Sequence, residues 1–215
     1  MNYIENIYIC LVAPILIVAI CAYERPRKMM LFVMSGMTAC LLSSYISTFL
    51  AAVHGADSVT ASAEIAPMVE ECMKLFPILF YLIVFEPKTE EQVGVALMVA
   101  SGFATLENVC YLVMNGAENV FSLMVRGFGT GAMHVVGGAM VGIGLTFFRN
   151  HLYMRIAGIM GLLSLAITFH AIYNLLVSQK GPVAWVGYLI PVVTMFLTLL
   201  LRRRRNPMSR PPEAY

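Results

Sequence analysis

The sequence is poor in charged residues. Only 12% of its 215 residues are Asp, Glu, Lys or Arg, 60% are hydrophobic, and the mean hydropathy is +0.80. A soluble domain carries about 25% charged residues, so this chain lacks the polar surface that would cover its apolar residues in water. The composition excludes a soluble globular protein, a disordered tail and a nucleic-acid-binding domain.

Other absences exclude particular chemistries. Asp57 is the one aspartate, so a pair of catalytic aspartates cannot form. No histidine is followed by glutamate, which removes the HExxH zinc motif, and no GxSG serine motif occurs. The five cysteines lack CxxC spacing and are interpreted as core residues without a redox or metal role.

Long apolar runs dominate what remains, and a spanning helix needs roughly 20 such residues. The pattern predicts an all-α polytopic membrane bundle of about seven transmembrane helices, forming one domain over residues 1–215. The seven segments are Ile4–Tyr23, Met29–Val53, Pro67–Phe85, Gln92–Met114, Ser122–Phe148, Leu152–Ser178 and Val183–Leu201.

The positions of lysine and arginine predict the orientation. Eleven of these residues lie in the odd-numbered loops and in a basic tail over 202–215, whereas the even-numbered loops carry only Lys180. Because cytoplasmic loops are enriched in Lys and Arg, we expect the N-terminus outside and the C-terminus in the cytoplasm.

Ionisable groups inside apolar segments are costly and need an explanation. With the predicted orientation, those of four successive segments all lie roughly 6–18 Å below the outer ends of their helices, at 1.5 Å per residue. This agreement predicts one polar site in the outer half of the membrane. Its residues are Glu70, Glu71, Lys74, Glu107, His134, His170 and Asn174.

Spacing along the helices suggests how these groups pair. Lys74 follows Glu70 by four residues and Glu71 by three, so it should contact one of these carboxylates. We expect Glu71 to be the base, because it lies deeper than Glu70. His170 and Asn174 share a helix face and could donate hydrogen bonds to an oxyanion.

The fifth segment also contains an arginine and two pairs of glycines that predict contacts. Arg126 is interpreted as an interfacial anchor or a carboxylate partner. The glycine pairs 127/131 and 138/142 are spaced by four, which is typical of close helix contacts. We therefore expect Gly138→Leu to disturb folding or activity.

Four motifs occur in order: EECMK at 70–74, FATLEN at 103–108, an isolated histidine at 134 and HAIYN at 170–174. This pattern resembles the PrsW family of membrane-embedded proteases, distant relatives of the CAAX prenyl-protease and bacteriocin-processing superfamily. The resemblance covers residues 67–178, the expected catalytic core helices. Glu107 replaces the histidine of the CAAX branch, which disfavours a prenylated substrate.

The resemblance implies a glutamic-type intramembrane endopeptidase, in which a glutamate activates water, in a cell membrane and most simply a prokaryotic plasma membrane. The implied substrate is a single-pass membrane protein such as an anti-sigma factor. No cofactor is required by this mechanism.

Two alternatives remain open. A zinc-dependent hydrolase could use Glu71, Glu107, His134 and His170 as ligands, although we favour the metal-free mechanism. A proton-coupled transporter would also place ionisable groups in the bundle, but it should show polar groups toward both faces and repeated halves.

Overall fold

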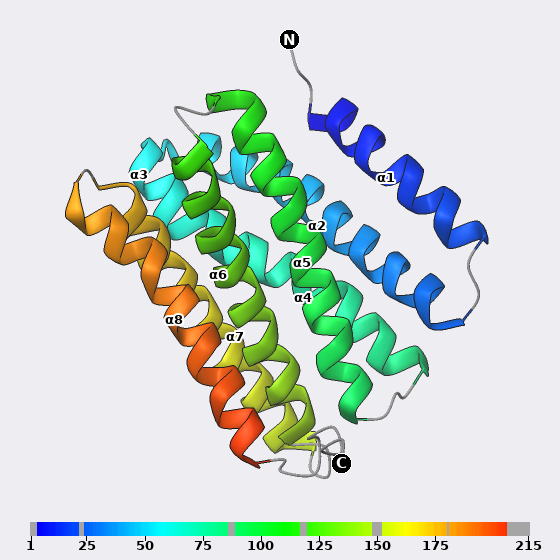
Figure 1. Cartoon of the computed structure of the whole chain (residues 1–215). Helices are drawn as coiled ribbons and strands as arrows, with labels where there is room; N and C mark the ends of the chain where they lie inside the picture. Colours follow the sequence, from blue (N-terminus) through cyan, green and yellow to red (C-terminus); the bar gives the residue numbers. More distant parts are fainter. Residues whose placement is uncertain are drawn as a thin grey trace, which may run out of the picture.

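The computed structural model describes residues 4–21, 24–85, 89–116, 120–147, 152–179 and 181–205, and the regular structure within these ranges is helical. Each of the seven predicted segments coincides with one long helix within the described residues (Figure 1). The basic tail beyond Arg205 lies outside them. The helices are α1 (Ile4–Cys21), α2 (Glu24–His54), α3 (Ser58–Thr60), the π-helix η1 (Ala61–Ile65), α4 (Ala66–Phe85), α5 (Thr89–Asn115), α6 (Val120–Phe147), α7 (Leu152–Val177) and α8 (Pro182–Arg205).

Four of the described helices are long and apolar enough to cross a membrane. The spans are Pro26–His54, Glu91–Asn115, Val120–Leu145 and Ile156–Val177, and Pro182–Thr198 is a shorter apolar helix. The seven-span count and the sides on which the termini lie therefore stay predictions.

The surface of α4 shows why this bundle suits a bilayer. Its inward face buries Val69, Ile78 and Leu82, while Phe76 and Phe80 on its outer face are each 63% exposed. Large aromatic side chains spread over an exposed helix face are compatible with lipid and unfavourable in water.

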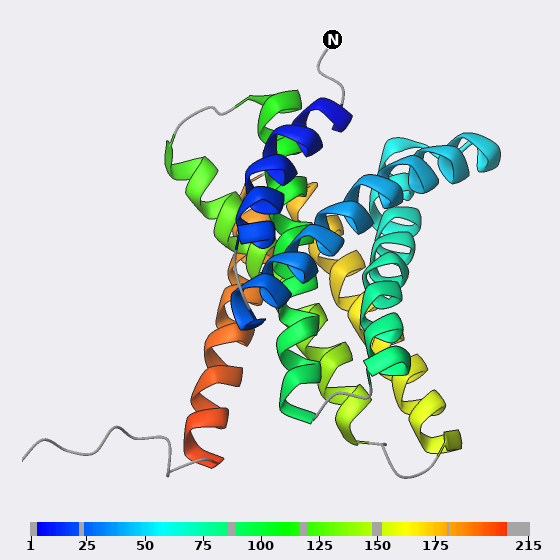
Figure 2. The same cartoon turned by 90° about the vertical axis from the view of Figure 1, so that its right-hand side faces the viewer.

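The inner face of helix α4 packs against several other helices. It contacts α2, α5 and α7, while α5 also packs on both α2 and α6. Helix α1 packs mainly on α2 at one edge, and α8 packs against α6 and α7 at the opposite edge (Figures 1 and 2). The predicted catalytic segments thus form the middle of the bundle.

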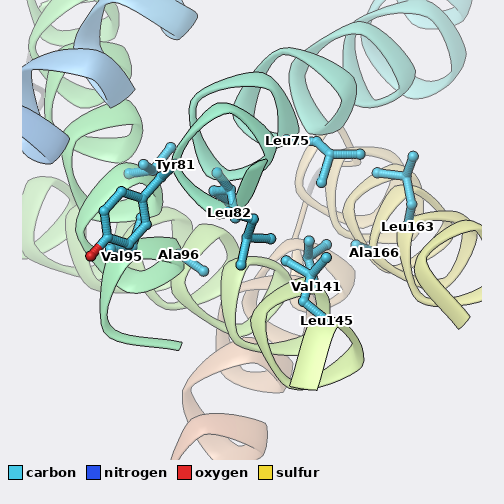
Figure 3. Close-up of a cluster of buried hydrophobic side chains, with 11 residues drawn as sticks. Leu75, Tyr81, Leu82, Val95, Ala96, Val141, Leu145, Leu163 and Ala166 are labelled. Atoms are coloured by element: carbon cyan, nitrogen blue, oxygen red, sulfur yellow. The ribbon is translucent and has the colours of Figure 1, made fainter. Parts of the chain in front are cut away.

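A dry core lies between α4, α5, α6 and α7, and Figure 3 shows its side chains pointing toward one another. Leu75 and Leu82 from α4 meet Val95 and Val141 from α5 and α6, and Leu163 joins them from α7. Because protein interiors pack at crystal-like density, this cluster fixes the four helices that carry the polar residues.

Glycines set two of the closest helix contacts. A Cβ at Gly36 would lie 2.0 Å from the Val99 carbonyl oxygen, and one at Gly102 would lie 1.9 Å from that of Val33. The α2 and α5 backbones therefore touch where they cross, and a side chain at either glycine would force them apart.

The predicted glycine contacts on α6 are half confirmed. A Cβ at Gly138 would lie 2.7 Å from Ala100 Cβ, and one at Gly142 would lie 2.9 Å from Ala96 Cβ, so both glycines pack against α5. By contrast, a Cβ at Gly127 or Gly131 would meet no atom within 4 Å, because these glycines face open space.

The short turn before α4 is held by a side-chain cap. Asp57 Oδ1 accepts a hydrogen bond from the Thr60 backbone N–H at 2.7 Å, which favours the charged carboxylate and lowers the pKa of Asp57. The cap starts a helical path that runs through α3 and η1 into α4 and so positions the first polar motif.

Candidate functional site

The structure brings together the residues that the sequence singled out. Helix α4 contributes Glu70, Glu71 and Lys74, α5 contributes Glu107, α6 contributes His134, and α7 contributes His170 and Asn174. They lie in one half of the bundle, beside η1 and the C-terminal half of α2.

Glu71 is the centre of a buried network. Lys74 Nζ donates to Glu71 Oε1 at 2.5 Å, and His170 Nδ1 donates to the same oxygen at 2.9 Å. The Glu71 and Lys74 side chains are only 2% and 4% exposed. The expected contact between Lys74 and one of the paired carboxylates is confirmed, and the carboxylate is Glu71.

His134 links this network to Glu107. Lys74 Nζ also lies 2.9 Å from His134 Nδ1, and His134 Nε2 contacts Glu107 Oε2. Because an ammonium only donates, Nδ1 accepts and Nε2 carries the proton that points to Glu107. The Phe103 ring lies 4.8 Å from Lys74 Nζ and 5.0 Å from the His134 ring, so it excludes water from one side.

Glu70 differs from its neighbour. Its side chain is 17% exposed, and its buried Oε2 atom has no hydrogen-bond partner among the described residues. His170 Nε2 lies 3.7 Å from that oxygen. In a neutral imidazole whose Nδ1 carries the proton, Nε2 presents a lone pair, so a carboxylate oxygen and a nitrogen lone pair face each other.

Arg126 lies beside Glu107 at the site. Its Nη2 lies 3.7 Å from Glu107 Oε1, which confirms the expected role as a carboxylate partner. The guanidinium stacks on the Tyr111 ring at 3.2 Å from Cζ to the centroid. Its Nε is buried without a hydrogen-bond partner among the described groups, so this cation keeps an unused donor at the site.

The Asn174 amide, which the sequence suggested as a donor to an oxyanion, has a backbone partner in the structure. Its Nδ2 donates to the Ser62 carbonyl of η1 at 2.9 Å, rather than pointing at a substrate position beside His170. The His170 Nδ1 donor is likewise used by Glu71. In this arrangement, one N–H of Asn174 and the Nδ1–H of His170 are used by neighbouring groups. The role of this pair at an oxyanion stays a prediction.

An open pocket of about 660 Å³ reaches this cluster. Glu70, Glu107, Arg126 and Asn174 line it, and Glu71, Lys74, His134 and His170 are buried side chains outside its lining. Its rim includes residues near the C-terminal ends of α2, α5 and α7 and the N-terminal part of α8, among them Tyr188. These parts share the end of the bundle that the predicted topology places outside.

Three side chains beside the pocket offer ligand atoms for a metal ion. Glu70, His134 and His170 each offer a ligand atom, and these atoms lie within 4.8 Å of one another. A cation between Glu70 Oε2 and His170 Nε2 would satisfy both atoms, and the Glu71 contact orients His170 as carboxylates commonly orient ligating histidines. The residues therefore fit a divalent cation.

This group differs from the ligand set suggested by the sequence, which held Glu71 and Glu107 in place of Glu70. The Glu71 carboxylate is already paired with Lys74 and His170. The Glu107 carboxylate is paired with His134 and Arg126. Glu71 was the expected base because of its burial. In the structure, the buried Glu71 carboxylate already accepts hydrogen bonds from Lys74 and His170.

The sequence missed several groups around the pocket. The Ser62 carbonyl beside Asn174 belongs to a segment remote in sequence. The Tyr111 ring beside Arg126 lies one turn after Glu107 on α5, but the sequence analysis gave it no role. Thr130 and Tyr173 share a buried hydrogen bond of 2.7 Å between α6 and α7. Phe103 was part of the FATLEN motif, one turn before Glu107 on the same helix face, and the structure adds its contacts with Lys74 and His134.

The fold and site define a class: a helical membrane protein whose ionisable residues from four successive long helices meet at a pocket, as an intramembrane hydrolase requires. Residues 24–201 match the family model described as PrsW family intramembrane metalloprotease. The match covers most of the chain, which therefore belongs to the PrsW family and is an intramembrane protease. Neither a curated protein nor a solved structure matches the chain.

Proposed function

We propose that this protein is a metal-dependent endopeptidase that cleaves single-pass membrane proteins, such as an anti-sigma factor, in the outer half of a prokaryotic plasma membrane. The observation that carries the proposal is the convergence of ligand atoms from Glu70, His134 and His170 beside an open pocket. The site residues also form one cluster rather than a file through the bundle, which favours hydrolysis over proton-coupled transport.

In this proposal, Glu70, His134 and His170 hold a divalent metal such as Zn²⁺, and three protein ligands are typical of catalytic zinc sites. When bound, the metal supplies Lewis-acid chemistry, polarising a scissile carbonyl and making water a stronger acid. This ligand set replaces the metal-free mechanism preferred from sequence, because the family description and the unpartnered Glu70 oxygen both point to a cation.

Glu107 is the base in this mechanism. It lines the pocket and is 28% exposed, so water can reach it, and Arg126 Nη2 lies 3.7 Å from its Oε1. When His134 ligates the metal through Nε2, the other oxygen of Glu107 is free to accept the proton of water. Glu107 takes a proton from water as the new C–O bond forms at the carbonyl carbon. It then passes that proton to the amine nitrogen as the peptide C–N bond breaks.

Arg126 stabilises the charge that develops on the carbonyl oxygen. Its guanidinium lines the pocket, and its unpartnered Nε offers a donor in a partly buried setting. Such preorganised donors are worth about 10²–10³ in rate. Glu71 and Lys74 act through the histidines that they contact, so they are positioning residues.

The metal-free mechanism stays as a second candidate because of one contact. Lys74 donates to His134 Nδ1, which leaves the proton on Nε2 and directed at Glu107. That tautomer suits a glutamate–histidine pair without a metal. Ligation through Nε2 requires Lys74 to give up its proton or this contact to change.

Metal analysis and chelation of the purified protein separate the two mechanisms. The protein in liposomes, with a panel of single-pass membrane proteins as substrates, should lose cleavage with a chelator and regain it with Zn²⁺. His170→Ala should lose both bound metal and cleavage, whereas His54→Ala, which changes an exposed histidine outside the site, should keep both. Chelator-resistant cleavage with no bound metal would establish the metal-free mechanism instead.

Glu107→Gln tests the assignment of the base. It should retain metal and lower cleavage by about 10²–10⁴, whereas Glu64→Gln, an exposed glutamate of η1, should cleave normally. Near-normal cleavage by Glu107→Gln would refute the assignment. Failure of every single-pass substrate while a soluble peptide is cut would refute the substrate class.

A further inference from the structure

A second pocket lies at the opposite end of the bundle from the candidate active site. It has a volume of about 640 Å³ and lies between the first part of α2 and the last part of α4. Its lining includes Arg27, Phe32 and Ser35 from α2 and Pro77, Phe80 and Phe85 from α4. Figure 2 shows α2 and α4 diverging toward this end.

The lining of this groove is polar at one end only. Arg27 and Lys28 lie at the entrance, where α2 starts its candidate span at Pro26. Beyond them, the lining is almost entirely aromatic and aliphatic as far as Ser35. The Ser35 hydroxyl donates to the Phe32 carbonyl at 2.8 Å, so it presents no free donor to an occupant.

The length of the groove matches one membrane leaflet. From Arg27 to Ser35, α2 rises about 12 Å at 1.5 Å per residue. The hydrocarbon of one leaflet is roughly 15 Å thick, half of the bilayer core. A groove that starts at the interface and ends near the membrane centre suits an acyl chain. It is too short for a transmembrane helix, which needs about 30 Å.

The two basic residues at the entrance are not equivalent. Lys28 Nζ lies 3.2 Å from Glu91 Oε2 and 4.5 Å from the Tyr81 ring centroid, and Tyr81 donates to the same oxygen of Glu91 at 3.1 Å. Glu91 therefore balances the charge of Lys28. Arg27 is exposed and has no carboxylate partner among the described residues, so its charge is available.

We infer that this groove binds an anionic phospholipid such as phosphatidylglycerol, with the headgroup at Arg27 and an acyl chain between α2 and α4. Arg27, which has no carboxylate partner among the described residues, attracts the negative headgroup, and the aromatic walls bury the chain. The exposed faces of Phe80 and Phe85, both 63% accessible, are then covered by lipid. This site is separate from the protease site and does not rest on the proposed function.

Native mass spectrometry of the purified full chain in detergent, titrated with phosphatidylglycerol or phosphatidylcholine, tests the inference. Phosphatidylglycerol should be retained more tightly. Arg27→Gln should weaken its binding about fivefold, since one basic residue near an anionic surface is worth about 1 kcal/mol, and should leave phosphatidylcholine nearly unchanged. Arg202→Gln removes the same charge from the C-terminal part of α8, outside the groove, and should weaken phosphatidylglycerol retention less than Arg27→Gln does.

Ser35→Phe tests the groove itself without changing charge, because a ring there fills the inner end. It should lower phosphatidylglycerol retention at least as much as Arg27→Gln, with a melting temperature in pure detergent close to wild type. Equal retention of the two lipids, or unchanged retention by either variant, would overturn the inference. Unchanged retention by Ser35→Phe together with impaired cleavage would assign the groove to a substrate helix instead.

Discussion

The contact between α5 and α6 gives a sharp test of how the fold supports the site. Gly138 faces α5, and a Cβ added there would lie 2.7 Å from Ala100 Cβ and 3.0 Å from the Ala96 carbonyl oxygen. Carbon atoms in ordinary contact are about 3.5–4.0 Å apart. Gly138→Ala should therefore move α6 away from α5 by about 1 Å, since both neighbouring atoms belong to short, rigid groups.

That displacement reaches the site, because His134 lies one turn before Gly138 on α6. Its Nδ1 is 2.9 Å from Lys74 Nζ on α4, and a shift of about 1 Å exceeds the range in which such a hydrogen bond survives. Overpacking costs about 1–3 kcal/mol and a lost buried hydrogen bond about 1–3 kcal/mol. The better helix propensity of alanine returns about 1 kcal/mol.

The net loss of about 1–5 kcal/mol corresponds to a melting temperature lower by roughly 2–20 °C, at about 2–4 °C per kcal/mol for a chain of this size. Intrinsic fluorescence of Trp185 during heating measures this change, and cleavage of a single-pass substrate measures the site. Gly138→Leu should have a larger effect on both, as the sequence analysis expected.

Gly131→Ala is the matched control. It makes the same substitution on the same helix, but its Cβ would meet no atom within 4 Å. It should melt at the wild-type temperature or slightly above it, because alanine favours the helix and nothing must move. If Gly138→Ala melted as high as Gly131→Ala and cleaved normally, the helix contact would not support the site as argued.

Three further predictions address other parts of the molecule. Arg126→Gln should lower cleavage about 10²–10³-fold without loss of bound metal, and equal loss of metal would show that Arg126 acts on the ligands instead. Asp57→Ala should weaken the cap of α3 and lower the melting temperature. The stability contributed by Asp57 is present above its unfolded pKa and lost as pH falls through its lowered folded pKa, so melts of wild type and Asp57→Asn should converge in acid. A reporter fused after Arg205 should be active only if it functions in the cytoplasm, and external activity would reverse the predicted orientation.

The paired glutamates show where reasoning from sequence stops. The EECMK motif correctly placed a lysine contact on this turn, because i, i+3 and i, i+4 neighbours meet on any helix. It could not tell which carboxylate would be paired. That outcome depends on the rotation of α4, which turns Glu71 toward His170 and Glu70 toward the pocket.

The contact between Asn174 and Ser62 shows the same limit at longer range. The HAIYN motif predicted that Asn174 would lie near His170, and helix geometry makes this certain. Its actual partner is a backbone carbonyl 112 residues earlier, in a π-helical turn that no local pattern in the sequence indicated. Backbone partners carry no side-chain signature, so motif reading does not find them.

Hydropathy determined the helices and their order along the chain, because long apolar runs are a local property of the sequence. The depth of each ionisable group in the membrane stays a prediction, because it depends on the orientation. The four motifs further determined the family and the list of residues that would meet. The tertiary structure decided the rotation of each helix and the distances between them. Those two variables separate Glu70 from Glu71, place Arg126 against Glu107 and open the groove beside Arg27, because they follow from side-chain packing among all the helices at once.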